Sequence, residues 1–482
     1  MDGKRPNREA LIELAKRQPE AVVDLVLDLW DRVEALEAKV AELTKNSRNS
    51  SKPPSSDKGN PNKPAKHPPR SKSKRKPGGQ RGHKGSTLEM SADPDTIINH
   101  GFEGHCNHCG DDLSRARVET FERRQLFDLP ALRVEVTEHR VACGRCPNCR
   151  KAIKGRFPQN VKAPAQYGPN IQALATYLGV YQMLPAERTS EFFNDLFDCP
   201  LSTGTVANIL CKAGGQAAPI AEDIKQTIAL GELFGADETG ASVNGKNHWL
   251  HIYCTEALSY YHFHPKRGFE ALEDIGILSD YTGGVVHDFY QSYYRYDGCK
   301  HYLCNAHHLR DLTYIHEEMK QPWAKEMIDL LLEAKKLRDR ENNGGRKIGP
   351  RTIDRILCKH RRILEDGYVL NPEPPKIKGK RGRPKRGKAL NMLDRFRDRE
   401  KEVLGFFLQQ GVPFDNNQAE RDLRMIKAKL KISGCFRSPS AAEGFANVRS
   451  VVSTARKAGR RMLEILRSLF RDPRALSANL LS

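Results

Sequence analysis

Three acidic residues in the C-terminal half of the chain stand where a carboxylate is costly to keep. Asp237 lies at the centre of a strand-like stretch, Asp288 ends a second such stretch, and Glu420 lies on a predicted helix. An acid on an apolar strand costs free energy unless it is paired, hydrogen-bonded or bound to a metal ion. Because hard cations such as Mg²⁺ prefer oxygen ligands, the three acids together predict a divalent-metal site.

Two strand aspartates followed by a helix glutamate are typical of the ribonuclease-H-like fold. In that fold three carboxylates hold two Mg²⁺ (or Mn²⁺) ions about 4 Å apart, which clamp the attacking and leaving oxygens of a phosphoryl displacement. Each acid alone is explained as well by a surface or turn position. Their order and context favour catalytic and metal-binding roles for Asp237, Asp288 and Glu420.

Two CxxC motifs, separated by 36 residues, predict a structural zinc site. Four thiolates in such a pair can converge tetrahedrally on one Zn²⁺ and hold a small domain together. The predicted ligands are Cys106, Cys109, Cys146 and Cys149. Cys143 could replace Cys149, since Cys143 and Cys146 also form a CxxC, but Pro147 and Asn148 suit the turn between the preferred pair. Surface thiols or a redox pair are the alternatives.

A heptad pattern near the N-terminus predicts a helix that pairs with a second copy of the chain. Valine recurs at one heptad position and leucine at another, which favours a parallel dimeric coiled coil. The residues are Val26, Val33 and Val40, and Leu29, Leu36 and Leu43. The alternative is a helix packed against its own chain.

Helix and strand patterns give the organisation of the rest. Short helices at 187–197 and 203–212, joined by a brief turn, have helix-turn-helix spacing, although helical hairpins of this size are also common in protein cores. Strands are predicted at 132–141, 232–243, 248–256, 258–264 and 284–288. The fold class is multidomain, α+β or α/β. The predicted segments are a coiled coil at 1–45, a disordered basic linker at 46–98, a zinc domain at 99–160, a helix-turn-helix-like region at 161–228, a catalytic domain at 229–435 with a helical insertion at about 313–410, and a helical tail at 436–482.

The formal charge of +20 indicates a polyanionic partner such as double-stranded DNA. Residues 44–87 carry a net +12 and residues 376–388 a net +8, which together account for the whole excess. A solvated linker is the simpler explanation of the first segment, although a basic linker also gains affinity by displacing counterions from phosphates. The second contains Arg381-Gly382-Arg383-Pro384, a weak match to an AT-hook. The predicted DNA-contacting residues are Arg381, Arg383, Lys385, Arg386 and Lys427.

Several protein classes are disfavoured by composition. Twelve cysteines in 482 residues are too sparse for a disulfide scaffold, and no apolar run is long enough to suggest a membrane span. The first residues carry charges rather than the apolar stretch of a signal peptide. We therefore expect a soluble protein of a reducing intracellular compartment, such as the cytoplasm, without membrane partners.

Against this background the chain resembles the TnpC-type DDE transposases of bacterial insertion-sequence family sixty-six over almost its full length. The matching stretches are 46–57, the CxxC pairs, Ala236-Asp237-Glu238-Thr239, His287-Asp288, Cys304-Asn305-Ala306-His307 and 416–421. The resemblance implies a zinc domain, a ribonuclease-H-like core with a helical insertion, and DDE roles for Asp237, Asp288 and Glu420. Cys143 departs from the family pattern, and Cys304 with His307 is interpreted as structural, because two ligands do not make a metal site.

The leading hypothesis is a DNA transposase that binds terminal inverted repeats, cleaves element ends and joins them to target DNA. A catalytically inactive DNA-binding protein and a ribonuclease-H-like nuclease without strand transfer are the alternatives. The expected partners are double-stranded DNA, a second copy of the chain and possible helper proteins encoded by the same element.

Overall fold

The computed structural model describes residues 8–43, 88–130, 132–374 and 386–481. Its contacts divide the chain into two units, one of residues 1–68, 139–191 and 200–482, the other of residues 69–138 and 192–199. The basic segment 44–87 and most of the basic loop, including Arg381, Arg383 and Lys385, lie outside the described residues. Within the described part of the chain, no helix has both the length and the apolar character to cross a membrane.

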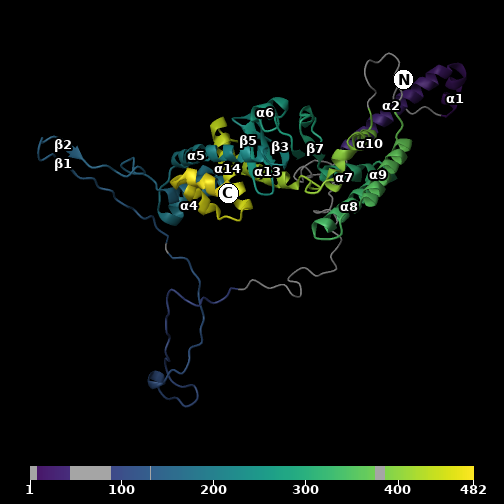
Figure 1. Cartoon of the computed structure of the whole chain (residues 1–482). Helices are drawn as coiled ribbons and strands as arrows, with labels where there is room; N and C mark the ends of the chain where they lie inside the picture. Colours follow the sequence, from purple (N-terminus) through teal and green to yellow (C-terminus); the bar gives the residue numbers. More distant parts are fainter. Residues whose placement is uncertain (1–7, 44–87, 131, 375–385, 482) are drawn as a thin grey trace. The chain divides into compact units, whose positions relative to one another are not determined.

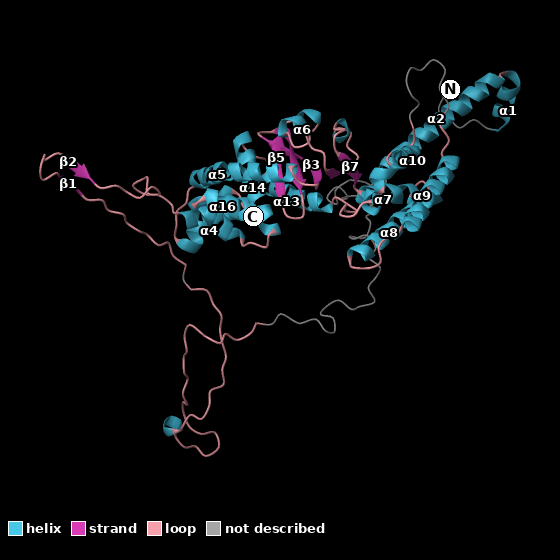
Figure 2. Ribbon diagram, in the orientation of Figure 1, coloured by secondary structure: helices cyan, strands magenta, loops and turns pink. Residues whose placement is uncertain are grey.

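A five-stranded sheet forms the centre of the first unit, and helices cover it (Figure 2). Its strands are β3 (Leu233–Val243), β4 (Lys246–Cys254), β5 (Ser259–His264), β6 (Gly284–His287) and β7 (Lys300–Leu303). Their spatial order is β5-β4-β3-β6-β7. The pairs β3/β4 and β4/β5 are antiparallel, whereas β6 and β7 run parallel to β3. The sheet is therefore mixed, and β3 lies at its centre.

Three long helices pack against β3, β4 and β5: α5 (Thr203–Ala229), α13 (Asn417–Ser433) and α14 (Pro439–Lys457). Helices α5 and α14 cross closely at Gly214, where an added Cβ would come within 2.4 Å of the Gly444 Cα. The close crossing therefore requires glycine. The predicted helix at 203–212 was too short, because α5 continues through Pro219 to Ala229 along a row of buried residues.

Between β7 and α13 the chain forms a helical insertion (Figure 1), whose hydrophobic core also includes Val286 of β6 and Tyr302 and Leu303 of β7. Its helices are α7 (Asn305–Glu317), α8 (Pro322–Asn342), α9 (Pro350–Leu370), α10 (Lys388–Asp398), α11 (Glu400–Val403) and α12 (Gly405–Leu408). Trp323, Leu331 and Phe396 are fully buried in this core. Helix α7 begins eight residues before the predicted start of the insertion, directly after β7.

The remaining described elements lie outside this insertion in the sequence. They are α1 (Arg8–Arg17), α2 (Pro19–Leu43), η2 (Leu113–Arg115), β1 (Cys143–Arg145), β2 (Ala152–Lys154), α3 (Pro169–Thr176), η3 (Tyr177–Tyr181), α4 (Ala186–Phe197), α6 (Phe269–Ile275), η4 (Tyr293–Arg295), α15 (Met462–Arg471) and α16 (Pro473–Leu481). On α2 the described side chains of the heptad pattern, from Val26 to Val40, are all more than half exposed. The strand predicted at 132–141 is wrong: its backbone pairs with no neighbouring strand, and Val136 is exposed.

Candidate active site

Asp237 lies in the middle of β3, the central strand. Because side chains alternate along a strand, Asp237 and its neighbour Glu238 point to opposite faces of the sheet. The Glu238 amide donates to Asp237 Oδ1 at 2.8 Å. Burial, followed by the charges of Glu238, Asp288 and Glu420, raises the pKa of Asp237 well above its ordinary value. The three predicted acids are therefore close enough to interact.

Asp288 follows directly after β6, the parallel neighbour of β3. In the register Gly235 pairs with Val286, so that Asp288 emerges beside the middle of β3. The amide of Tyr290 donates to Asp288 Oδ1 at 3.0 Å, which fixes the carboxylate at the start of the loop.

Glu420 lies in the first turn of α13, and buried Asn416 holds that turn against the sheet. The Asn416 side chain donates to the Ala236 carbonyl at 2.8 Å, and its backbone amide donates to Cys304 Sγ at 3.1 Å. An added Cβ on Gly235 would come within 2.3 Å of Asn416 Oδ1. Glycine at this position therefore allows the helix to approach β3.

A second buried carboxylate, Glu238, was missed by the sequence analysis. Its oxygens accept hydrogen bonds from Arg267 Nε at 2.8 Å and from the Tyr293 hydroxyl at 2.9 Å. The Arg267 guanidinium lies 4.1 Å from the centre of the Tyr290 ring. Tyr290 is also the residue whose backbone amide donates to Asp288. The Glu238–Arg267 pair thus supports the Asp288 loop from the opposite face of the sheet.

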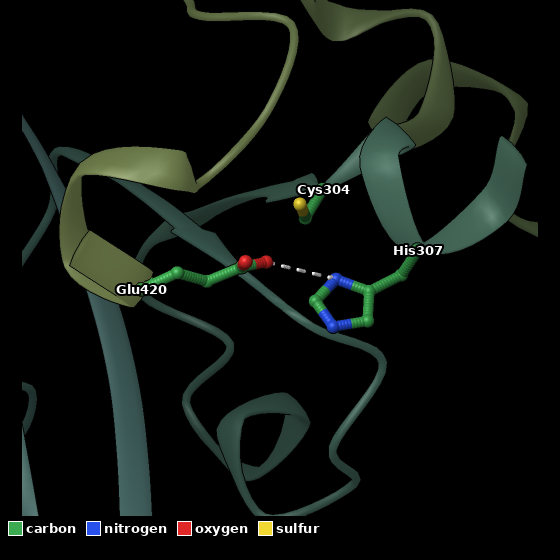
Figure 3. A group of neighbouring side chains, drawn as sticks. All are labelled: Cys304, His307 and Glu420. Carbon is green, nitrogen blue, oxygen red and sulfur yellow. Dashed lines mark ion pairs between the residues drawn. The ribbon is translucent and has the colours of Figure 1, made fainter. Parts of the chain in front are cut away.

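Glu420 also meets the first turn and a half of α7 (Figure 3). His307 Nδ1 lies 3.7 Å from Glu420 Oε1, and Arg310 Nη2 lies 3.6 Å from Glu420 Oε2. Ligand atoms of Cys304, His307 and Glu420 all lie within 4.8 Å of one another. Burial raises the pKa of the Cys304 thiol to about 12, and burial lowers the pKa of His307 despite the nearby Glu420 charge. The structure therefore supplies the third neighbour that the sequence pair Cys304/His307 lacked.

Arg386 and Lys427 are the predicted DNA-contacting residues that the structure describes. Arg386 is mostly buried and forms ion pairs with Glu373 and Asp394, so its charge is already neutralised within the protein. Lys427 is exposed on α13. Just beyond Arg386, Lys388 pairs with Asp311 at 2.9 Å, which brings the end of the basic loop to α7.

The first CxxC forms a tight loop around its leading cysteine. The Cys106 amide donates to the Asp111 carbonyl at 2.7 Å, and the Gly110 amide donates to the Cys106 carbonyl at 2.8 Å. Backbone amides of His108 and Cys109 lower the pKa of the Cys106 thiol. Gly110 has a φ of 77° and supplies the left-handed turn that closes the loop.

The second CxxC repeats this arrangement. The Cys146 amide donates to the Lys151 carbonyl at 2.9 Å, and the Arg150 amide donates to the Cys146 carbonyl at 2.9 Å. Amides of Cys149 and Asn148 lower the pKa of Cys146, and Arg150 adopts a left-handed φ of 57°. Cys143 lies outside this loop, on β1. The local geometry therefore matches the Cys146/Cys149 pair.

Removing the charge of Asp237 should stabilise the metal-free protein. Folding raises the pKa of Asp237 above its ordinary value of 3.8. The free energy of unfolding therefore falls as the pH rises from that ordinary value through the pKa of the folded state. We expect Asp237→Asn to raise the free energy of unfolding at neutral pH in EDTA by about 0.5–2 kcal/mol. Thermal unfolding with and without Mg²⁺ measures this effect. Asp280→Asn, at an exposed position, is the control, and equal melting temperatures for wild type and Asp237→Asn in EDTA would contradict the expectation.

The fold and site define a class of mixed α and β proteins with an acidic cluster on a central sheet. Among known families, the one described as Transposase IS66 family matches residues 164–444, which is more than half of the chain. A family of unknown function, DUF6444, matches residues 6–89. No curated protein matches the chain. The chain belongs to the Transposase IS66 family. Membership implies a DNA-processing enzyme that binds DNA and uses a divalent metal ion.

Proposed function

We propose that this transposase binds the terminal inverted repeats of its element, cleaves the ends and joins them to target DNA by in-line phosphoryl transfer. The observation that carries the proposal is the position of the three carboxylates around the middle of β3. Asp237 lies on β3, Asp288 follows the paired strand β6, and Glu420 lies in the first turn of α13, which Asn416 attaches to the Ala236 carbonyl. The strand order β5-β4-β3-β6-β7, antiparallel on one side of β3 and parallel on the other, supports a ribonuclease-H-like core.

The donor set fits a hard cation. Glu420 Oε1 is buried and accepts no hydrogen bond, and burial together with the charges of neighbouring carboxylates raises the pKa of Asp237. In the proposed enzyme the three carboxylates hold Mg²⁺ or Mn²⁺, which would stabilise charge on the phosphoryl oxygens. The protein's own part is to fix these carboxylates: Tyr290 holds Asp288, Asn416 places the Glu420 helix, and Arg267 neutralises Glu238 below the site.

The other segments are assigned supporting roles. The exposed valine and leucine side chains of α2 support a homodimeric coiled coil. Helices α4 and α5 are assigned the part of a helix-turn-helix-like reader of DNA, on the basis of their order and the short segment that joins them. We assign DNA-phosphate contacts to the basic loop through Arg381, Arg383 and Lys385. Arg386 is left out of this assignment, because Glu373 and Asp394 already neutralise its charge.

A strand-transfer assay on labelled element ends tests the proposal. With purified protein, target DNA and Mg²⁺, we expect nicked ends and joined products, and neither in EDTA. Cleavage without joining would instead identify a nuclease. End binding without cleavage, in Mg²⁺ and in Mn²⁺ alike, would identify an inactive DNA-binding protein.

A further inference from the structure

The group formed by Cys304, His307 and Glu420 contains two polar atoms that have no hydrogen-bond partner. His307 Nδ1 and Glu420 Oε1 are both buried and unpaired, and they face each other across 3.7 Å. That separation is too long for a hydrogen bond. Buried polar atoms without partners cost about 1–3 kcal/mol each. A ligand that contacts both His307 Nδ1 and Glu420 Oε1 is therefore expected between these two atoms.

A transition-metal ion fits this gap. Zn²⁺ binds histidine nitrogen and carboxylate oxygen at about 2.0–2.2 Å, so one ion can bridge atoms up to about 4 Å apart. The 3.7 Å between His307 Nδ1 and Glu420 Oε1 lies within that reach. Cys304 Sγ lies within 4.8 Å of a ring nitrogen of His307 and of a carboxylate oxygen of Glu420, and it is the third candidate ligand. Arg310 contacts the other oxygen of Glu420 and leaves Oε1 available.

The ligand types distinguish this site from the carboxylate cluster. Sulfur and imidazole ligands select Zn²⁺ and similar ions, whereas Mg²⁺ requires oxygen ligands. The sulfur is also held in place, because it accepts a hydrogen bond from the Asn416 amide at 3.1 Å. The segment that begins at Asn416 therefore fixes Cys304 Sγ and also carries Glu420.

We propose that Cys304, His307 and Glu420 form a binding site for one divalent ion of the Zn²⁺ class, and that this ion inhibits the enzyme by drawing Glu420 away from the Mg²⁺-binding carboxylates. Three protein ligands leave a fourth position for water. Metal binding stands on the geometry alone, whereas the inhibitory effect rests on the proposed function.

Binding is tested by titrating the full-length protein, with its structural zinc in place, with Co²⁺. Wild type should bind one ion per chain with a sulfur-to-cobalt charge-transfer band. Cys304→Ser should lose the band, and His307→Gln should bind at least about tenfold more weakly. His307 is partly exposed, so its variant is expected to fold. Cys435→Ser removes an exposed thiol just beyond α13 and should bind as wild type does. Identical titrations for wild type, Cys304→Ser and His307→Gln would overturn the site.

Inhibition is tested separately by strand transfer in Mg²⁺ with one equivalent of added Zn²⁺. We expect added Zn²⁺ to lower the activity of wild type at least tenfold. The activity of Cys304→Ser, relative to the same variant without Zn²⁺, should fall by a smaller factor. Zinc bound without loss of activity would overturn the inhibitory role. A protein inactive in Mg²⁺ alone would contradict the proposed function while leaving the cobalt result to decide the site.

Discussion

Asp237→Asn, Asp288→Asn and Glu420→Gln should each abolish DNA cleavage and joining while leaving binding to element ends largely intact. Each substitution keeps the shape of the side chain and removes one charge from the metal-binding cluster. We expect activity to fall by at least about 10³-fold, equivalent to about 4 kcal/mol of lost transition-state stabilisation. Strand transfer in Mg²⁺ measures activity, and gel retardation of labelled ends measures binding.

Asp280→Asn is the matched control, because Asp280 is exposed and lies shortly before β6. It should retain wild-type activity. Should any one of the three variants keep near-wild-type strand transfer, that residue would be removed from the catalytic assignment. Loss of end binding in all three would indicate a folding defect, which the stability measurement on Asp237→Asn detects independently.

The strands that carry the aspartates could be predicted because their sequences are apolar and bounded by turn residues. Predictions for β3 to β6 agree with the structure to within two residues at each end. In contrast, β7 was missed, since only four residues pair and the first of them is exposed. The strand predicted at 132–141 shows the converse error: residues with strand propensity form no strand where no partner strand lies beside them.

The contacts around Glu420 could not be predicted, because they join segments far apart in the sequence. His307 and Arg310 reach Glu420 only because α7 starts directly after β7, next to the strand that leads to Asp288. Similarly, the sequence does not distinguish the role of Glu238 from that of the neighbouring acid Asp237. Only the alternation of side chains, together with Arg267, shows that it lies on the other face and plays a different part.

We expect the chain to hold about one structural zinc ion through Cys106, Cys109, Cys146 and Cys149. Each loop presents its first cysteine to backbone amides in the same way, an arrangement that stabilises thiolates. Binding of structural zinc contributes about 10–16 kcal/mol in small zinc domains, so losing a ligand should unfold the segment around it. We expect Cys146→Ser to lose the ion and to become sensitive to proteolysis between residues 99 and 160. Elemental analysis and limited proteolysis of purified protein measure both effects.

Two substitutions beside the same loop serve as controls for this prediction. Cys143→Ser should retain zinc, because Cys143 lies on β1 outside the loop. Arg150→Gly should also retain zinc, because glycine adopts the left-handed φ of 57° more easily than arginine does. If Cys143→Ser lost the ion while Cys149→Ser kept it, the second ligand pair would be Cys143 and Cys146. A purified protein without zinc would refute the site altogether. The hydrogen bonds of the two loops would then serve only to close turns.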